Sequence, residues 1–256
     1  MAARPVRIAH AYGNSREGLR RALDADVDMI EVDLWFRGGD LRVHHARRLT
    51  PLPIFVDRKT PMHPLPPYAV RVWKGYYAWP DIKTLTLGEL LETTNGRKRL
   101  LLDVKGNYPS RGGDAFASAI AKEVRAHDAA AWVTVCGQTY PPLNSLRRIA
   151  PEIEVRYSLE QPFQWESFLG KMQRDETVRQ VCMSHRFIDD EKARIMEENG
   201  VDLYVWTVDD PERALHWVNQ GVDGIISNNL ELLETLPRTT AREHGTGNTE
   251  HGTATP

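Results

Sequence analysis

Short apolar runs alternate with amphipathic stretches along most of the chain, and this alternation predicts its secondary structure. The apolar runs predict strands at residues 6–11, 29–36, 99–105, 132–138, 153–159, 178–184, 201–208 and 222–228, with a short further strand at 41–45. The amphipathic stretches predict helices at residues 15–25, 85–94, 114–127, 142–150, 162–172, 189–200, 210–221 and 230–236.

Residues at the ends of three expected helices agree with this assignment. Ser15 can cap the first helix because its hydroxyl can accept a hydrogen bond from an N–H of the first turn. Gly200 is a natural C-cap, since glycine adopts the left-handed conformation that often ends a helix. Pro211 falls in the first turn of a later helix, where its missing N–H is tolerated.

Strand–helix alternation implies parallel strands joined by right-handed crossovers. Eight principal strands predict an α/β fold, a (β/α)8 TIM barrel in a single domain over residues 1–237. A doubly wound open sheet is the alternative. Residues 46–83 are proline-rich and interrupt the alternation, so they predict an insertion over one face, after the second and third strands. Residues 238–256 are polar and rich in Gly and Thr, which predicts a disordered tail.

Composition narrows the class of protein. The chain has 256 residues, a net charge of -2 and 41% apolar residues, which suffices for a large core and gives no case for nucleic-acid binding. It contains no apolar run long enough for a transmembrane helix, and its first residues lack the features of a signal peptide. Cys136 and Cys182 are expected to be buried free thiols in a reducing cytoplasm.

Side chains suited to chemistry lie near the carboxyl ends of the expected strands, where barrel enzymes place their active sites. They are His10, Glu31, Asp33, His45, Asp103, Lys105, Gln138, His185, Trp206, Thr207, Ser227 and Asn228. Glu31 and Asp33 are two residues apart and therefore share one face of a strand, as do Asp103 and Lys105. Three carboxylates in a barrel interior repel each other unless a cation neutralises them. Oxygen ligands favour Mg2+ or Ca2+; ion pairs with Lys105 or with arginines are the alternative.

Two histidines adjoin this carboxylate cluster. His10 and His45 end neighbouring strands, and an imidazole can give or take a proton near neutral pH. His44 faces opposite to His45 on a regular strand and is not expected to be catalytic. For each histidine taken alone, a hydrogen-bonded core residue is the competing interpretation.

Together these residues resemble the glycerophosphodiester phosphodiesterase family, whose members are (β/α)8 barrels. The matching stretches are "IAHAYGNS" with His10 and Asn14, "IEVD", "VHHARRL" with His45 and Leu49, "LLLDVK" with Asp103 in place of Glu, "LYVWTV" and "GVDGIISN". The resemblance covers about residues 6–236. The chain departs from the family pattern at Ala11, which replaces an arginine, and at Ala46, which replaces an aspartate.

The resemblance implies hydrolysis of a glycerophosphodiester to sn-glycerol 3-phosphate and an alcohol, with a small-molecule phosphodiester as substrate. It implies a divalent cation, Mg2+ or Ca2+, held by Glu31, Asp33 and Asp103. It implies acid–base catalysis by His10 and His45, with the two roles unassigned. Lys105 would face the phosphate, and Trp206 would either contact the substrate or fill the top of the barrel.

Two alternatives stay open. The first is a lysophospholipase D-like or other alkyl phosphodiesterase, favoured if the aromatic insertion around Trp73, Tyr76, Tyr77 and Trp79 forms an apolar groove or makes transient contact with a membrane. A choline-type headgroup could also contact these rings, but a lid that packs over the barrel mouth is the favoured interpretation. The second is a non-catalytic barrel that binds phosphate-bearing ligands, suggested by Ala11 and Ala46. No oligomeric state is predicted.

Overall fold

The computed structural model describes residues 5–49, 52, 54–60, 65–80, 84–106, 108 and 110–237. Within these residues, eight parallel strands close into a barrel, because β1 pairs with both β14 and β2. The barrel strands are β1 (Val6–Ala9), β2 (Met29–Arg37), β9 (Arg99–Val104), β10 (Val133–Gly137), β11 (Glu154–Leu159), β12 (Gln180–Ser184), β13 (Asp202–Trp206) and β14 (Gly224–Ser227). This confirms the predicted TIM barrel and excludes the open sheet.

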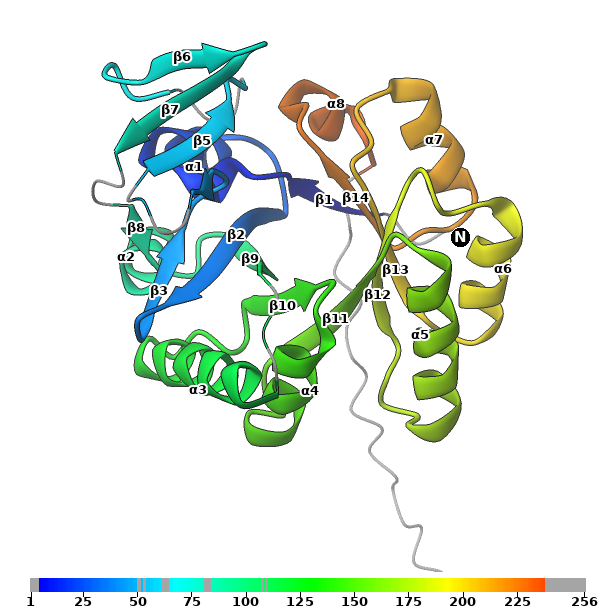
Figure 1. Ribbon diagram of the computed structural model, residues 1–256. Helices are drawn as coiled ribbons and strands as arrows, with labels where there is room; N and C mark the ends of the chain where they lie inside the picture. Colours follow the sequence, from blue (N-terminus) through cyan, green and yellow to red (C-terminus); the bar gives the residue numbers. More distant parts are fainter. Residues whose placement is uncertain are drawn as a thin grey trace, which may run out of the picture.

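Helices follow the strands and cover the outside of the barrel (Figure 1). They are α1 (Arg16–Asp24), α2 (Leu87–Thr94), α3 (Ser110–Ala126), α4 (Tyr140–Ile149), α5 (Pro162–Arg174), α6 (Asp190–Glu198), α7 (Pro211–Asn219) and α8 (Leu230–Thr235), with a 3-10 turn η1 (Tyr12–Asn14) before α1. The Ser15 hydroxyl accepts from Gly18 N–H as predicted, and Pro211 is the first residue of α7. Gly200 has a φ of +64° just after α6, the conformation expected of a C-cap glycine.

The chain between β2 and β9 adds two structures to the barrel. Strands β3 (Asp40–Val43) and β8 (Leu85–Thr86) extend the barrel sheet in antiparallel fashion beside β2. A separate antiparallel sheet contains β4 (Arg47–Arg48), β5 (Ile54–Arg58), β7 (Tyr76–Pro80) and β6 (Val70–Trp73), in that spatial order. Figure 1 shows this small sheet standing beside α1 at one end of the barrel. Residues 50, 51, 53, 61–64 and 81–83 of the predicted insertion, and the predicted tail at 238–256, lie outside the described residues.

The apolar core lies mainly between the barrel wall and the helices. Val32 and Leu34 of β2 point outward into this layer and are fully buried. A smaller group fills the barrel interior and includes Ile8, Leu101 and the two cysteines. Cys136 and Cys182 are buried and carry no disulfide, as the sequence predicted. Apolar packing does not explain why β2 and β9 also place the acids Glu31, Asp33 and Asp103 inside the barrel.

Among the described helices, none is both long enough and apolar enough to cross a membrane.

Candidate functional site

Three carboxylates meet inside the barrel on two neighbouring strands. Glu31 and Asp33 project from β2, and Asp103 projects from β9. The two strands run parallel in a register that places Asp33 beside Asp103. One oxygen of each carboxylate lies within 4.8 Å of the others. Because side chains alternate along a strand, the two-residue spacing in β2 puts both acids on the inner face.

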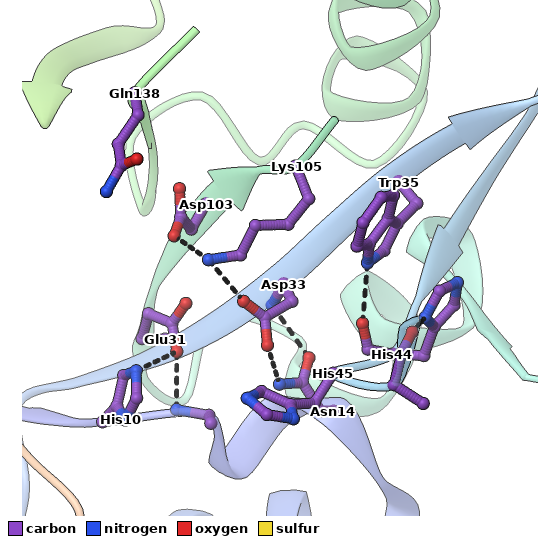
Figure 2. Close-up of polar contacts among 12 residues, drawn as sticks. His10, Asn14, Glu31, Asp33, Trp35, His44, His45, Asp103, Lys105 and Gln138 are labelled. Carbon is purple, nitrogen blue, oxygen red and sulfur yellow. Dashed lines mark hydrogen bonds and ion pairs between the residues drawn. The ribbon is translucent and has the colours of Figure 1, made fainter. Parts of the chain in front are cut away.

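Lys105 lies between these acids (Figure 2). Its Nζ is 2.7 Å from Asp33 Oδ1 and also pairs with Asp103 Oδ2. Burial alone would lower the pKa of Lys105, but attraction to Asp103, Asp33 and Glu31 raises it well above its usual value. The lysine is therefore a permanent positive charge at the centre of the site.

The charge of the site is unbalanced in spite of this lysine. Burial raises the pKa of Glu31 well above its usual range, and repulsion from Asp33 adds to the shift. Burial also raises the pKa of Asp103. Burial would raise the pKa of Asp33 too, but attraction to Lys105 holds it below its usual range. Two of the three acids thus resist ionisation, which is expected where carboxylates face each other without enough positive charge.

A divalent cation fits this donor set. All three candidate ligands are carboxylates, which suit hard ions such as Mg2+ or Ca2+ better than zinc. Burial, with repulsion from Asp33, now raises the pKa of Glu31 and Asp103, and such an ion would favour their ionised forms.

His10 approaches the cluster from the end of β1. Its Nε2 is 3.9 Å from Glu31 Oε2, and its Nδ1 is 2.7 Å from Asn228 Oδ1. The Asn228 amide is fixed in turn, because its Nδ2 and backbone N–H each donate to Asp209 at 2.7 Å. An amide oxygen only accepts hydrogen bonds, so Nδ1 of His10 must carry the proton. In the neutral ring, Nε2 then presents its lone pair toward the site.

His45 approaches from the other side, just after β3. Its Nδ1 is 2.7 Å from Oδ2 of Asp57, a residue of β5 in the small sheet. This hydrogen bond raises the pKa of His45, although partial burial opposes the shift. Attraction to Asp33 contributes in the same direction. The small sheet therefore helps to set the charge of His45.

The neighbouring His44 lies in a different environment. Its ring stacks on Trp35 at 5.4 Å and contacts Phe55 at 4.6 Å between centroids. Its Nδ1 lies 2.8 Å from the Ala46 carbonyl oxygen, and Trp35 Nε1 donates to the His44 carbonyl at 2.9 Å. These contacts turn the ring of His44 toward the aromatic residues between the barrel and the small sheet.

The turn after β1 holds the acids of β2 in place. The backbone N–H of Ala11 donates to Glu31 Oε2 at 2.5 Å. Asn14 bonds twice to Asp33: its Nδ2 donates to Oδ2 at 2.6 Å, and its Oδ1 accepts from the Asp33 N–H at 2.8 Å. The turn is closely packed, because a Cβ added at Gly13 would lie 2.3 Å from a methyl group of Val32.

A cavity of about 430 Å³ opens above these residues. Its lining includes His10, Glu31, Asp103, Lys105, Gln138, Trp206 and Arg47. The indole Nε1 of Trp206 is buried and has no hydrogen-bond partner among the described residues. The cavity is the right size for a small molecule, and Glu31 and Asp103 of the carboxylate cluster line it.

The structure thus brings six of the sequence-selected residues into one region: His10, Glu31, Asp33, His45, Asp103 and Lys105. Trp206 lines the cavity of about 430 Å³ with His10, Glu31, Asp103 and Lys105. His45 lines a neighbouring cavity with Asn14 and Asp57. Sequence reasoning missed Asp57 and Asp209. Asp209 follows the "LYVWTV" strand end and could have been suspected from that position alone. Asp57 lies in the inserted segment and carried no recognisable signal.

Comparison with known proteins supports the barrel. No family model matches the sequence, and no curated protein matches it. Among solved structures, a protein of Silicibacter pomeroyi DSS-3, provisionally named a glycerophosphoryl diester phosphodiesterase, superposes with a TM-score of 0.68 at 20% identity, over 90% of this chain and 92% of that one. A glycerophosphodiester phosphodiesterase of Parabacteroides distasonis ATCC 8503 gives 0.67 at 18% identity, over 91% and 97%.

A third structure contains a ligand. It is an Oleispira antarctica phosphodiesterase in complex with the product sn-glycerol-3-phosphate, with a TM-score of 0.64 at 19% identity, over 90% of this chain and 95% of that one. At these identities the likeness establishes the shared barrel fold. All three structures carry phosphodiesterase names, in agreement with the resemblance found in the sequence motifs.

Proposed function

We propose that this chain is a phosphodiester hydrolase of the glycerophosphodiester phosphodiesterase type. It would convert a glycerophosphodiester to sn-glycerol 3-phosphate and an alcohol. The observation that carries the proposal is the buried cluster of Glu31, Asp33 and Asp103, flanked by His10 and His45 at the mouth of a barrel. The phosphodiesterase names of its structural neighbours support the same reaction.

Glu31, Asp33 and Asp103 are the proposed ligands of one divalent cation, Mg2+ or Ca2+. When bound, the ion would act as a Lewis acid that polarises the phosphoryl oxygens. Asn14 and the Ala11 N–H orient two of the ligands. Lys105, which remains charged, is proposed to attract a phosphate oxygen into the site.

His10 is the proposed general base. Its Nδ1 proton is held by Asn228, so the lone pair of Nε2 points into the cavity. It would take the proton of the attacking group, either water or a hydroxyl of the substrate glycerol. Attack by water gives sn-glycerol 3-phosphate directly, whereas attack by the hydroxyl gives a cyclic phosphodiester that water must then open. Asn228 and Asp209 would act as positioning residues, because they fix the tautomer of the ring without reaching the substrate.

His45 is the proposed general acid. Its Nδ1 faces the Asp57 carboxylate at 2.7 Å, which stabilises the doubly protonated ring. Its Nε2–H would protonate the leaving alkoxide as the phosphorus–oxygen bond breaks. The two histidines thus differ by their partners, a neutral amide for His10 and a carboxylate for His45.

The small sheet supports the lysophospholipid alternative as a second candidate. Val70, Val72 and Trp73 of β6 are exposed by 65%, 55% and 64% of their surface. Exposed apolar residues grouped in this way are typical of interaction sites, and transient membrane contact through them would bring a lipid substrate to the barrel. Two of the aromatic rings proposed for choline already contact cations of the protein, because Lys74 lies over Trp73 and Arg58 lies over Tyr76.

The buried free thiols of Cys136 and Cys182 agree with a cytoplasmic enzyme.

The reaction itself can be tested directly. The protein is incubated with glycerophosphocholine, glycerophosphoinositol or lysophosphatidylcholine, each with Mg2+, Ca2+ or EDTA, and products are identified by mass spectrometry. We expect sn-glycerol 3-phosphate from the first two substrates with a divalent cation and no product in EDTA. Product from lysophosphatidylcholine, but not from the other two substrates, would favour the lysophospholipase D-like enzyme. Binding without product under every metal condition would favour the non-catalytic barrel.

The role of Asp57 predicts a pH effect. The Asp57 hydrogen bond raises the pKa of His45, and a general acid must be protonated, so activity falls as the pH rises through that pKa. Asp57→Asn removes the carboxylate and should move the alkaline limb of the kcat profile to lower pH. Asp114→Asn removes an exposed carboxylate of α3, remote from the cavity, and should leave the limb in place. An unchanged limb in Asp57→Asn would contradict the assignment of His45 as the acid.

A further inference from the structure

A second cleft adjoins the catalytic cavity, and the two meet at Arg47. This cleft has a volume of about 840 Å³ and lies between the β2–β3 hairpin and strands β4 and β5 of the small sheet. Arg47 of β4 lines both the cleft and the catalytic cavity. A molecule held in the cavity could therefore continue into the cleft past this side chain.

The positively charged side chains of the catalytic cavity differ in how far carboxylates of the protein already engage them. Lys105 is engaged by Asp33 and Asp103. The position after His10, where the resembling family carries an arginine, is Ala11, whose methyl group is fully buried. Arg47 is exposed, and no carboxylate of the described residues pairs with it within 4.0 Å. It is therefore the cation best placed to meet an incoming phosphodiester.

The cleft itself is strongly basic and partly aromatic. Among the described residues that line it are four arginines, Arg37, Arg42, Arg47 and Arg48, and one acid, Asp40. Asp40 is already paired with Arg42 at 2.8 Å. Trp35, Phe36 and Phe55 supply the apolar part of the wall. Guanidinium groups bind phosphate by paired, directional hydrogen bonds, so this lining favours an anionic group and disfavours a cationic one such as choline.

We propose that this cleft binds the alcohol part of the substrate when that part carries a further phosphate, with Arg47 binding the phosphodiester at the junction. The inference rests on the proposed function, because it places the scissile phosphodiester in the cavity beside Lys105. The substrate class is a glycerophosphodiester whose headgroup bears an additional phosphomonoester.

Two compounds that differ by a single phosphate provide the test. Glycerophosphoinositol and glycerophosphoinositol 4-phosphate are compared by kcat/KM with the wild type, Arg47→Met, Arg48→Met and Arg71→Met. We expect the wild type to prefer the phosphorylated compound. Arg48 lines the cleft but not the cavity, so Arg48→Met should reduce that preference by about tenfold, the effect expected for one charge-assisted hydrogen bond. Arg47→Met should lower kcat/KM for both compounds by about tenfold or more.

Arg71→Met is the matched control, because Arg71 belongs to β6 of the same small sheet and lines neither space. It should change neither kcat/KM nor the preference. Binding of both compounds to the His10→Asn variant, measured by calorimetry, separates this inference from the proposed function. If His10→Asn binds the phosphorylated compound more strongly and the double variant His10→Asn/Arg48→Met loses that preference, the proposed role of the cleft is supported. This holds even if the wild type releases no product. Equal binding of the two compounds, or a preference that Arg48→Met leaves intact, would overturn it.

Discussion

Replacement of His45 by asparagine is expected to lower kcat for glycerophosphocholine by about 10²–10⁴-fold, the usual contribution of a general acid or base. An alkoxide leaves poorly without a proton, and the proposed donor is Nε2 of His45, whose Nδ1 is occupied by Asp57. His44→Asn is the control. The amide of asparagine can keep the hydrogen bond that His44 Nδ1 makes with Ala46, and no chemistry is assigned to His44.

A substrate with a different leaving group distinguishes the two histidines. A p-nitrophenyl phosphodiester releases a stable anion that needs little protonation. The defect of His45→Asn should therefore shrink with this substrate, whereas the defect of His10→Asn should persist, because the attacking group still has to lose its proton. The opposite pattern, rescue of His10→Asn alone, would exchange the two roles. Equal defects with both substrates would contradict acid catalysis by His45.

Removal of one carboxylate of the cluster is the second large effect that we expect. Glu31→Gln keeps the size of the side chain and an oxygen that can accept the Ala11 N–H, but it removes the charge that a cation needs. Metal affinity should fall, and hydrolysis should drop by about 10²-fold or more, as expected when an electrostatic stabiliser of the transition state is lost.

The same substitution should have an opposite effect on the protein without metal. Burial and repulsion from Asp33 raise the pKa of Glu31, which means that its charged form is unfavourable in the folded protein. A neutral glutamine avoids this cost, so Glu31→Gln in EDTA should melt at the same temperature as the wild type or higher.

Thermal unfolding with and without metal separates these effects. A cation present at about 100 times its Kd stabilises a protein by about 2.7 kcal/mol, which corresponds to about 5–10 °C in Tm for a domain of this size. The wild type should show this gain with Mg2+ or Ca2+, and Glu31→Gln should lose most of it. Glu198→Gln, an exposed change on α6, is the control and should retain it. If the metal raised the Tm of Glu31→Gln as much as that of Glu198→Gln, Glu31 would not be a metal ligand.

Some parts of the site followed from local rules. The two-residue spacing of Glu31 and Asp33 predicts a shared face on any regular strand, and Asp103 and Lys105 obey the same rule. The expectation that they meet required the parallel barrel, in which strand ends gather at one mouth. The register of β2 and β9 then placed Asp33 beside Asp103.

Other parts depended on contacts between distant segments. Asp57 reaches His45 only because β5 of the small sheet folds back over the mouth of the barrel. Asn228 reaches His10 because β14 pairs with β1 and closes the barrel, 218 residues apart in sequence. The basic cleft likewise needs β3 and β4 to face each other. No periodicity encodes such contacts, because each depends on how two elements pack.

The sequence by itself determined the barrel, its strand and helix pattern, and the inward placement of the acids, because these depend on short-range periodicity and on the rules of parallel sheets. The tertiary structure decided what surrounds each group. It gave His10 an amide partner and His45 a carboxylate partner, and it placed Arg47 between two cavities. The physical reason is that protonation and ligand preference follow from the electrostatic surroundings of a side chain, and those surroundings are assembled from segments that are far apart along the chain.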